Sequence, residues 1–227
     1  MIPLQDDHRA TSRAYVTMTL IGVCCAVFLW QNSLDALAAR RAVDALGAIP
    51  AVIFGDARLP GDLQWVPRFA PVLTSMFMHA NWMHLLGNLL FLWIFGGNVE
   101  DAMGHVRYAA FYLLSGVVAF AAQGLATPHS AYPIIGASGA ISGVLGAYFV
   151  MFPRARVLTL VVLPFFVTTV RLPAMLLLLL WFVVQIVSHF ADHGEGVAFI
   201  AHIGGFIAGV ALGPSFRRGD GSAGAMC

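Results

Sequence analysis

Charged side chains are scarce in this sequence, and lysine is absent altogether. Only 10% of the 227 residues are charged, whereas a typical water-soluble domain carries roughly a quarter. Hydrophobic residues make up 59% of the chain, and the mean hydropathy is +0.83. This composition excludes an ordinary soluble domain and indicates a protein of the lipid bilayer. The net charge of +1 gives no basis for nucleic-acid binding.

Cysteine is also sparse, and the usual metal-binding patterns are missing. Cys24, Cys25 and Cys227 have no spacing typical of a disulfide framework. His79, His84 and His202 could be considered as zinc ligands, but no HExxH motif is present. The apolar segments around these histidines contain no carboxylate before their ends. We therefore expect no metal site.

Six apolar segments dominate what is present. Each can cross ~30 Å of hydrocarbon at ~1.5 Å per residue. They lie at approximately 14–31, 80–98, 107–126, 134–152, 172–190 and 197–213.

This pattern predicts an all-α polytopic membrane protein with six transmembrane helices. We place the membrane domain at residues 14–213. A polar N-terminal segment at 1–13 precedes it, and a disordered tail at 214–227 follows it.

Two further stretches are apolar but unsuited to a span. Residues 32–79 alternate apolar patches with proline and glycine, which predicts a large membrane-associated first loop with short interfacial helices. Residues 157–170 would reach only about 21 Å as a helix, and Pro164 interrupts them. We interpret this second stretch as a loop that lies on the membrane or dips into it. A full span there would invert the last helix.

The arginines predict the orientation. With six spans, both termini share one side with the loops after the second and fourth spans. That side holds eight of the 12 arginines, and the long first loop holds the other four. Because positive residues favour the cytoplasmic side, we expect cytoplasmic termini in a bacterial inner membrane.

Three polar side chains fall at one predicted depth. His84 and Ser138 each lie 16 residues before the first charge at the inner end of their spans, and His202 lies 15 residues before it. At ~1.5 Å per residue, each is about 23–24 Å above the inner boundary. Ionisable groups in membrane spans are costly and mark functional sites. The common depth therefore predicts a site near the outer surface.

Ser138 and His202 form the predicted centre of that site. Small residues follow each of them at helical spacing, including Gly205 and Gly209 after the histidine, so their two helices can approach closely. A serine hydroxyl needs a base to remove its proton, and imidazole is suited to this role. We predict a Ser138–His202 dyad for acyl transfer, without a third, acidic member.

His84 and Asn88 are predicted to stabilise the oxyanion of that reaction. They are four residues apart and so share one helix face. Their side chains could donate together with the backbone N–H of Ser138, which opens a helix. Gly136 and Gly139 flank the serine and permit close approach of a neighbouring helix or a substrate backbone.

At this point the sequence resembles the rhomboid intramembrane serine proteases. The matching motifs run in the family's order, and the resemblance extends over about residues 65–213. They are His84-Leu85-Leu86-Gly87-Asn88, Gly136-Ala137-Ser138-Gly139 and Ala201-His202-Ile203-Gly204-Gly205 with Gly209, to which His79 and the stretch Gly96–Gly104 add further matches.

The resemblance implies a six-helix bundle with a water-filled cavity that opens outward. It implies that Ser138 attacks, that His202 is the base, and that His84 and Asn88 help to form the oxyanion hole. Transmembrane proteins of the bilayer would be the substrates, and no cofactor is needed. The oligomeric state is left open.

The chain departs from the family pattern at two places. Some members have a tyrosine one turn after the nucleophile, stacked on the catalytic histidine, and Ser142 occupies that position here. The Trp-Arg pair of many first loops is also absent, and Trp65-Val66-Pro67-Arg68 is the nearest stretch. The first departure leaves open what holds His202.

Two other functions compete with a protease. A non-catalytic relative would bind or escort transmembrane helices, and failure of Ser138 to react with a serine-directed probe would favour it. A small transporter would use the polar residues as a permeation path. The transporter hypothesis ranks last because the sequence lacks paired half-helices and acidic relay residues.

Overall fold

The computed structural model describes residues 1–8, 10–55, 57–163, 166–191 and 197–218. Five helices within these residues are long and apolar enough to cross a membrane. They are α1 (Tyr15–Ser33), α5 (Trp82–Met103), α6 (His105–Ala126), α8 (Ala174–Ala191) and α9 (Phe199–Phe216). A sixth, shorter apolar helix is α7 (Ser138–Met151). The predicted helical membrane fold is confirmed.

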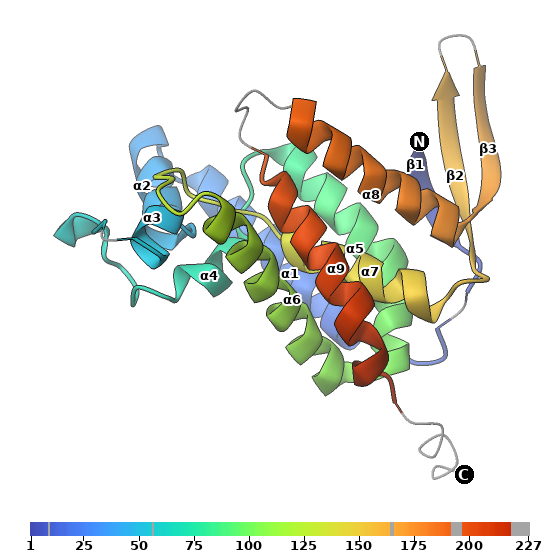
Figure 1. Cartoon of the computed structure of the whole chain (residues 1–227). Helices are drawn as coiled ribbons and strands as arrows, with labels where there is room; N and C mark the ends of the chain where they lie inside the picture. Colours follow the sequence, from blue (N-terminus) through green and yellow to red (C-terminus); the bar gives the residue numbers. More distant parts are fainter. Residues whose placement is uncertain (9, 56, 164–165, 192–196, 219–227) are drawn as a thin grey trace.

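Helix α7 lies at the centre of the bundle, with α5, α6, α8 and α9 around it (Figure 1). It is almost entirely buried and has only 14 residues, so it is about 21 Å long. It begins at Ser138, four residues later than the apolar run suggests, because residues 134–137 are not helical. Ile134 instead forms an antiparallel bridge with Ala48 in the first loop. The nucleophile candidate therefore opens its helix.

Helices α7 and α9 pack backbone against backbone. A Cβ atom at Gly205 would overlap the carbonyl oxygen of Gly139, and one at Gly209 would overlap that of Gly143. A Cβ at Gly146 would in turn meet the carbonyl of Phe206. The small-residue stripes thus let the two helices approach as closely as their main chains allow.

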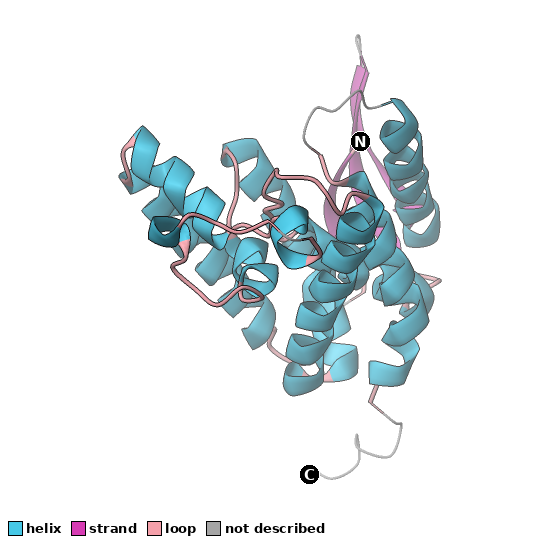
Figure 2. Cartoon of the chain, turned by 60° about the vertical axis from the view of Figure 1, so that its left-hand side comes forward, coloured by secondary structure: helices cyan, strands magenta, loops and turns pink. Residues whose placement is uncertain are grey.

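The first loop consists of short helical turns beside the bundle (Figures 1 and 2). They are α2 (Ala36–Leu46), α3 (Pro50–Ile53), η1 (Gly61–Leu63), α4 (Pro71–Thr74) and η2 (Ser75–Phe77). Arg68 donates from Nε to the carbonyl of Val52 and from Nη2 to that of Gly55, both at 2.7 Å. The guanidinium thereby binds the carbonyls at the C-terminal end of α3.

The prediction of a loop at 157–170 was wrong. The chain forms a β-hairpin of β2 (Arg156–Leu163) and β3 (Phe166–Pro173), and β1 (Ile2–Asp6) pairs with β2 to give a three-stranded antiparallel sheet of order β1-β2-β3. β-Branched residues favour strand structure, and strand pairing supplies hydrogen bonds that a membrane loop would lack. The tip, which includes Pro164, lies outside the described residues. The segment is not a seventh spanning helix.

The segments just before α1 and just after α9 meet the same end of the bundle. Asp101, near the end of α5, accepts hydrogen bonds from the N–H groups of Thr11 and Ser12. The N–H of Arg218, just after α9, donates to the carbonyl of Ala102. The boundaries predicted at residues 13 and 213 stay predictions. Helix α9 continues to Phe216, and residues 219–227 of the predicted tail lie outside the described residues.

Candidate active site

Ser138 lies at the N-terminus of α7, in a turn that only glycine fits well. Gly136 has φ +124°, in the region that disfavours side chains. A Cβ at this position would also lie 2.6 Å from Nε2 of His84. Gly136 therefore permits both the sharp entry into α7 and the close approach of the His84 ring.

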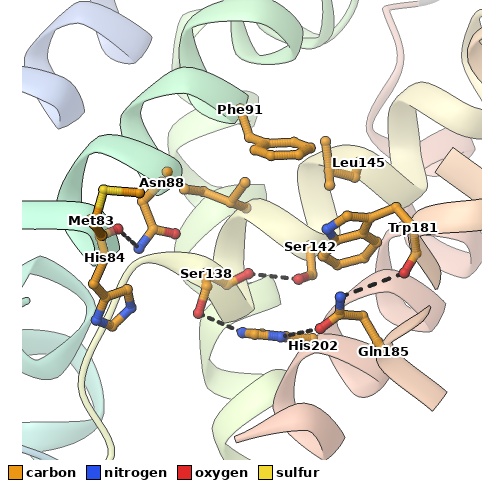
Figure 3. Close-up of a pocket in the computed structure, with 12 residues that line it drawn as sticks. Met83, His84, Asn88, Phe91, Ser138, Ser142, Leu145, Trp181, Gln185 and His202 are labelled. Carbon is orange, nitrogen blue, oxygen red and sulfur yellow. Dashed lines mark hydrogen bonds between the residues drawn. The ribbon is translucent and has the colours of Figure 1, made fainter. Parts of the chain in front are cut away.

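The hydroxyl of Ser138 and the ring of His202 are in direct contact. The distance from Oγ of Ser138 to Nε2 of His202 is 2.7 Å. The serine comes from α7 and the histidine from α9, 64 residues later. Figure 3 shows the hydroxyl directed at the ring. This geometry suits proton transfer from the hydroxyl to the imidazole.

The other ring nitrogen of His202 contacts Gln185, a residue that sequence reasoning missed. Nδ1 lies 2.7 Å from Oε1 of Gln185 on α8. A signal was available, because Gln185 is the only strongly polar side chain in the apolar run from Ala174 to Val187. The sequence could not show that this side chain faces α9 rather than lipid.

Ser142 does not take over the role of a stacked tyrosine. Its hydroxyl donates to the carbonyl oxygen of Ser138, one turn earlier in α7, at 2.6 Å. The ring of Trp181 from α8 lies beside His202, with centroids 6.1 Å apart and planes inclined by 38°. Phe199 of α9 also packs edge-on against His202, with centroids 6.3 Å apart. Aromatic packing at His202 thus comes from α8 and α9 and not from α7.

His84 and Asn88 lie on the opposite side of Ser138 from His202 (Figure 3). The amide nitrogen of Asn88 donates to the carbonyl of His84 at 2.9 Å, which leaves its second N–H available. Nδ1 of His84 accepts from the N–H of Ala80 at 3.4 Å, so the proton of a neutral ring is on Nε2. That nitrogen is the one that lies against Gly136 beside the serine.

His79 lies behind His84 and outside the spanning helices. It is 2% exposed, and its ring centroid is 5.1 Å from that of His84 at an interplanar angle of 70°. Burial lowers the pKa of His79 to about 4, so its ring is neutral at physiological pH. Its contact is with the ring of His84, and it does not line the cavity at Ser138.

One cavity of about 230 Å³ is lined by Ser138, His202, Gln185, His84 and Asn88. Apolar residues of α5, α7 and α8 form much of its wall, among them Phe91, Leu145 and Trp181. Among the described residues that line it, no carboxylate occurs, and the titratable groups are His84 and His202. The site can therefore accept an uncharged segment of chain close to a hydroxyl, an imidazole and several N–H donors.

Comparison with known proteins places the chain in a family. The Rhomboid domain model matches residues 66–219. The mitochondrial presenilin-associated rhomboid-like protein of Mus musculus is 31% identical over 153 residues, which cover 62% of this chain and 40% of that protein. Mitochondrial rhomboid protein 1 of Saccharomyces cerevisiae is 30% identical over 138 residues, covering 54% and 40% of the two chains.

A plant relative is similar over a shorter stretch. The chloroplastic rhomboid-like protein 11 of Arabidopsis thaliana is 42% identical over 78 residues, or 34% of this chain and 28% of that protein. The matched part thus spans 40% or less of the length of these three relatives. With the domain match, the helical bundle and its apolar surface together, the chain belongs to the rhomboid family of integral membrane proteins.

Proposed function

We propose that this protein is an intramembrane serine endopeptidase that hydrolyses peptide bonds in or near transmembrane helices. The single observation that carries the proposal is the 2.7 Å contact between Oγ of Ser138 and Nε2 of His202 inside a membrane helical bundle. Rhomboid proteins are generally proteases of this kind, and the family membership supports the same chemistry here.

In the first half of the reaction, Nε2 of His202 removes the proton of Ser138 as Oγ attacks the scissile carbonyl carbon. A tetrahedral intermediate forms, and His202 then returns the proton to the leaving amine as the C–N bond breaks. The product is an ester between Ser138 and the acyl part of the substrate. In the second half, a water molecule gives a proton to His202 as it attacks the ester, and a second tetrahedral intermediate forms. His202 then returns the proton to Oγ of Ser138 as the ester C–O bond breaks, which releases the acid and restores the hydroxyl.

The negative oxygen of both intermediates needs hydrogen-bond donors. Three lie around Ser138, which are its own N–H, Nε2–H of His84 and the second amide N–H of Asn88. The N–H of Ser138 belongs to the first turn of α7, where the first intrahelical bond is made by Ile141 to Ala137. The positive end of the helix dipole adds to this stabilisation.

The substrates would be transmembrane proteins that reach the cavity from the bilayer. Its apolar wall and the lack of a carboxylate among its described residues favour an uncharged peptide segment. A soluble, charged peptide would have to lose its hydration on entering, without a charged partner to compensate.

We also propose that both termini face the compartment that attracts positive charge. Thr11 and Arg218 both contact the α5–α6 junction, which supports one common side. Eight of the 12 arginines belong to that side. The mouse and yeast relatives carry mitochondrial names and the plant one a chloroplast name, so the comparisons do not support a bacterial inner membrane. Thiol labelling at Cys227 and at an introduced Ser130→Cys should report opposite sides.

Cleavage of a model transmembrane substrate by the purified protein tests the enzymatic function. We expect Ser138→Ala and His202→Ala to abolish cleavage and to prevent labelling by a fluorophosphonate. Ser115→Ala is the matched control, because Ser115 is a buried serine of α6 that does not line the cavity. Full activity of Ser138→Ala would refute the proposal. If Ser138 of the folded wild type does not react with the fluorophosphonate, the alternative function is favoured, in which the protein binds transmembrane helices without cutting them.

A further inference from the structure

We propose that Gln185 of α8 is the positioning residue of the dyad. Its amide oxygen holds His202 in the tautomer and the orientation in which Nε2 can accept the proton of Ser138. This inference rests on the proposed function, since the orientation of a base matters only where the serine is activated.

The two contacts of the His202 ring define its tautomer. Oε1 of Gln185 lies 2.7 Å from Nδ1, and Oγ of Ser138 lies 2.7 Å from Nε2, on the other side of the ring (Figure 3). An amide oxygen can only accept a hydrogen bond. Nδ1 must therefore carry the proton of the neutral ring, which leaves the lone pair of Nε2 directed at the serine hydroxyl.

The orientation of the Gln185 amide is itself determined by its helix. Nε2 of Gln185 points to the carbonyl of Trp181, four residues earlier in α8, at 3.5 Å. A flipped amide would direct its oxygen at this carbonyl, so that two acceptors would face each other. Gln185 is only 9% exposed, so water competes weakly for its oxygen. The acceptor therefore stays directed at His202.

The neighbouring side chains described below do not accept a hydrogen bond from the His202 ring, so Gln185 is the residue that orients it. Ser142 donates its hydroxyl to the carbonyl of Ser138, and the Trp181 ring offers His202 only a packing surface. The described residues lining the cavity include no carboxylate. Gln185 thus occupies the place that an aspartate takes in a catalytic triad. It differs in being neutral, so it orients the imidazolium without balancing its charge.

Gln185 lies on a different helix from either residue of the dyad. Ser138 and His202 belong to α7 and α9, whose backbones are in contact through their glycines. Gln185 belongs to α8, the least buried of the five long apolar helices. Alignment of the base therefore depends on α8 packing against α9, so a displacement of α8 would free the His202 ring.

The first test replaces Gln185 by a residue of similar length whose thioether accepts hydrogen bonds only weakly. For purified Gln185→Met, we expect kcat on a transmembrane substrate and the fluorophosphonate labelling rate to fall about 10- to 100-fold, as for the loss of one hydrogen bond to a charged group. KM should stay unchanged. In ¹⁵N spectra of the imidazole, the wild-type ring should show the Nδ1–H form, and the variant should lose this preference.

A second variant restores the acceptor and adds charge. Gln185→Glu should regain activity to within about tenfold of the wild type. Its carboxylate favours the imidazolium, so the acidic limb of the kcat/KM profile should move to higher pH. Gln123→Met is the matched control, because Gln123 of α6 accepts at 3.3 Å from the N–H of Ala201, next to the histidine, without contacting its ring. We expect its pH profile and its kcat to equal those of the wild type.

A Gln185→Met enzyme with the kcat of the Gln123→Met control would overturn the inference. So would a Gln185→Glu profile that superimposes on the wild type, and this second result decides alone if the methionine variant does not fold. Failure of the proposed function looks different, because the wild type itself would neither cleave nor label. The ¹⁵N tautomer measurement needs no activity and still tests the Gln185 contact in that case.

Discussion

Gly205 of α9 packs directly on the backbone carbonyl of Gly139 in α7, within one helical turn of both His202 and Ser138. The distance between the two side chains of the dyad is thus determined by a contact between main chains. A side chain added at Gly205 would therefore have to push α7 and α9 apart.

Gly205→Ala tests this relationship. We expect the added methyl group to cost about 1–3 kcal/mol of stability through overpacking and to reduce cleavage sharply, because His202 moves away from Ser138. Thermal unfolding in detergent and substrate cleavage measure the two effects. Gly22→Ala is the control, since nothing lies within 4 Å of a Cβ at that position of α1. Normal activity of Gly205→Ala would show that the helices can separate without disturbing the dyad.

Glu100 should be more important for stability than its place in a membrane helix suggests. The carboxylate is 1% exposed and accepts from the N–H groups of Val16 and Thr17, both at 2.8 Å, at the start of α1. It also lies 2.6 Å from Nδ1 of His105. Glu100→Gln would direct an NH₂ group at one of these donors.

We therefore expect Glu100→Gln to lose about 1–3 kcal/mol, seen as a lower unfolding temperature. Asp44→Asn, in helix α2 of the first loop, serves as the control. An unfolding temperature of Glu100→Gln equal to that of the control would mean that α1 is anchored by other contacts.

The folded protein should become less stable as the pH is lowered, because His79 binds a proton less readily in the folded state than in the unfolded state. Burial lowers the pKa of His79 to about 4 in the folded state, whereas an unfolded histidine titrates near about 6.5. The folded state thus binds the proton less well than the unfolded state. This contribution is present above pH ~6.5 and is lost as the pH falls from there towards about 4.

His79→Phe removes this titration while keeping a ring of similar size. In the described part of the chain, neither ring nitrogen of His79 has a hydrogen-bond partner, so phenylalanine loses none. We expect its unfolding temperature to decline less than that of the wild type between pH 7 and pH 4.5. His129→Gln, at an exposed position, should follow the wild type. Parallel curves for His79→Phe and wild type would contradict the assignment.

Arg68 should stabilise the first loop through the geometry of its hydrogen bonds to backbone carbonyls more than through its positive charge. Its guanidinium reaches the carbonyls of Val52, Ile53 and Gly55, which a lysine ammonium cannot match. We expect Arg68→Lys to destabilise the loop by about 1 kcal/mol, measured as faster proteolysis between α3 and α4. Arg40→Ala, at an exposed position of α2, should leave that rate unchanged. Equal rates for both variants would argue against the role.

The family and the helical membrane fold could be predicted from the sequence because both depend on local or one-dimensional patterns. A run of apolar residues long enough to cross the bilayer must satisfy its backbone internally, and only a helix does so within one segment. The hairpin β2–β3 pairs locally, but it was missed because a short apolar run interrupted by Pro164 does not by itself separate a strand pair from a membrane-associated loop. The third strand, β1, pairs with β2 from about 150 residues away in the chain. A short apolar stretch carries no signal for such a partner.

The candidate site, like the fold, could be predicted from the sequence only in part. The sequence by itself predicts one common depth for a serine and two histidines, because the rise per residue is constant along a helix. Which side chain holds His202 depends on how α8 is rotated against α9, and only the tertiary structure decided that Gln185 faces the ring. Helix rotation follows from the packing of whole surfaces, and the run Ala174–Val187 is apolar on every other face.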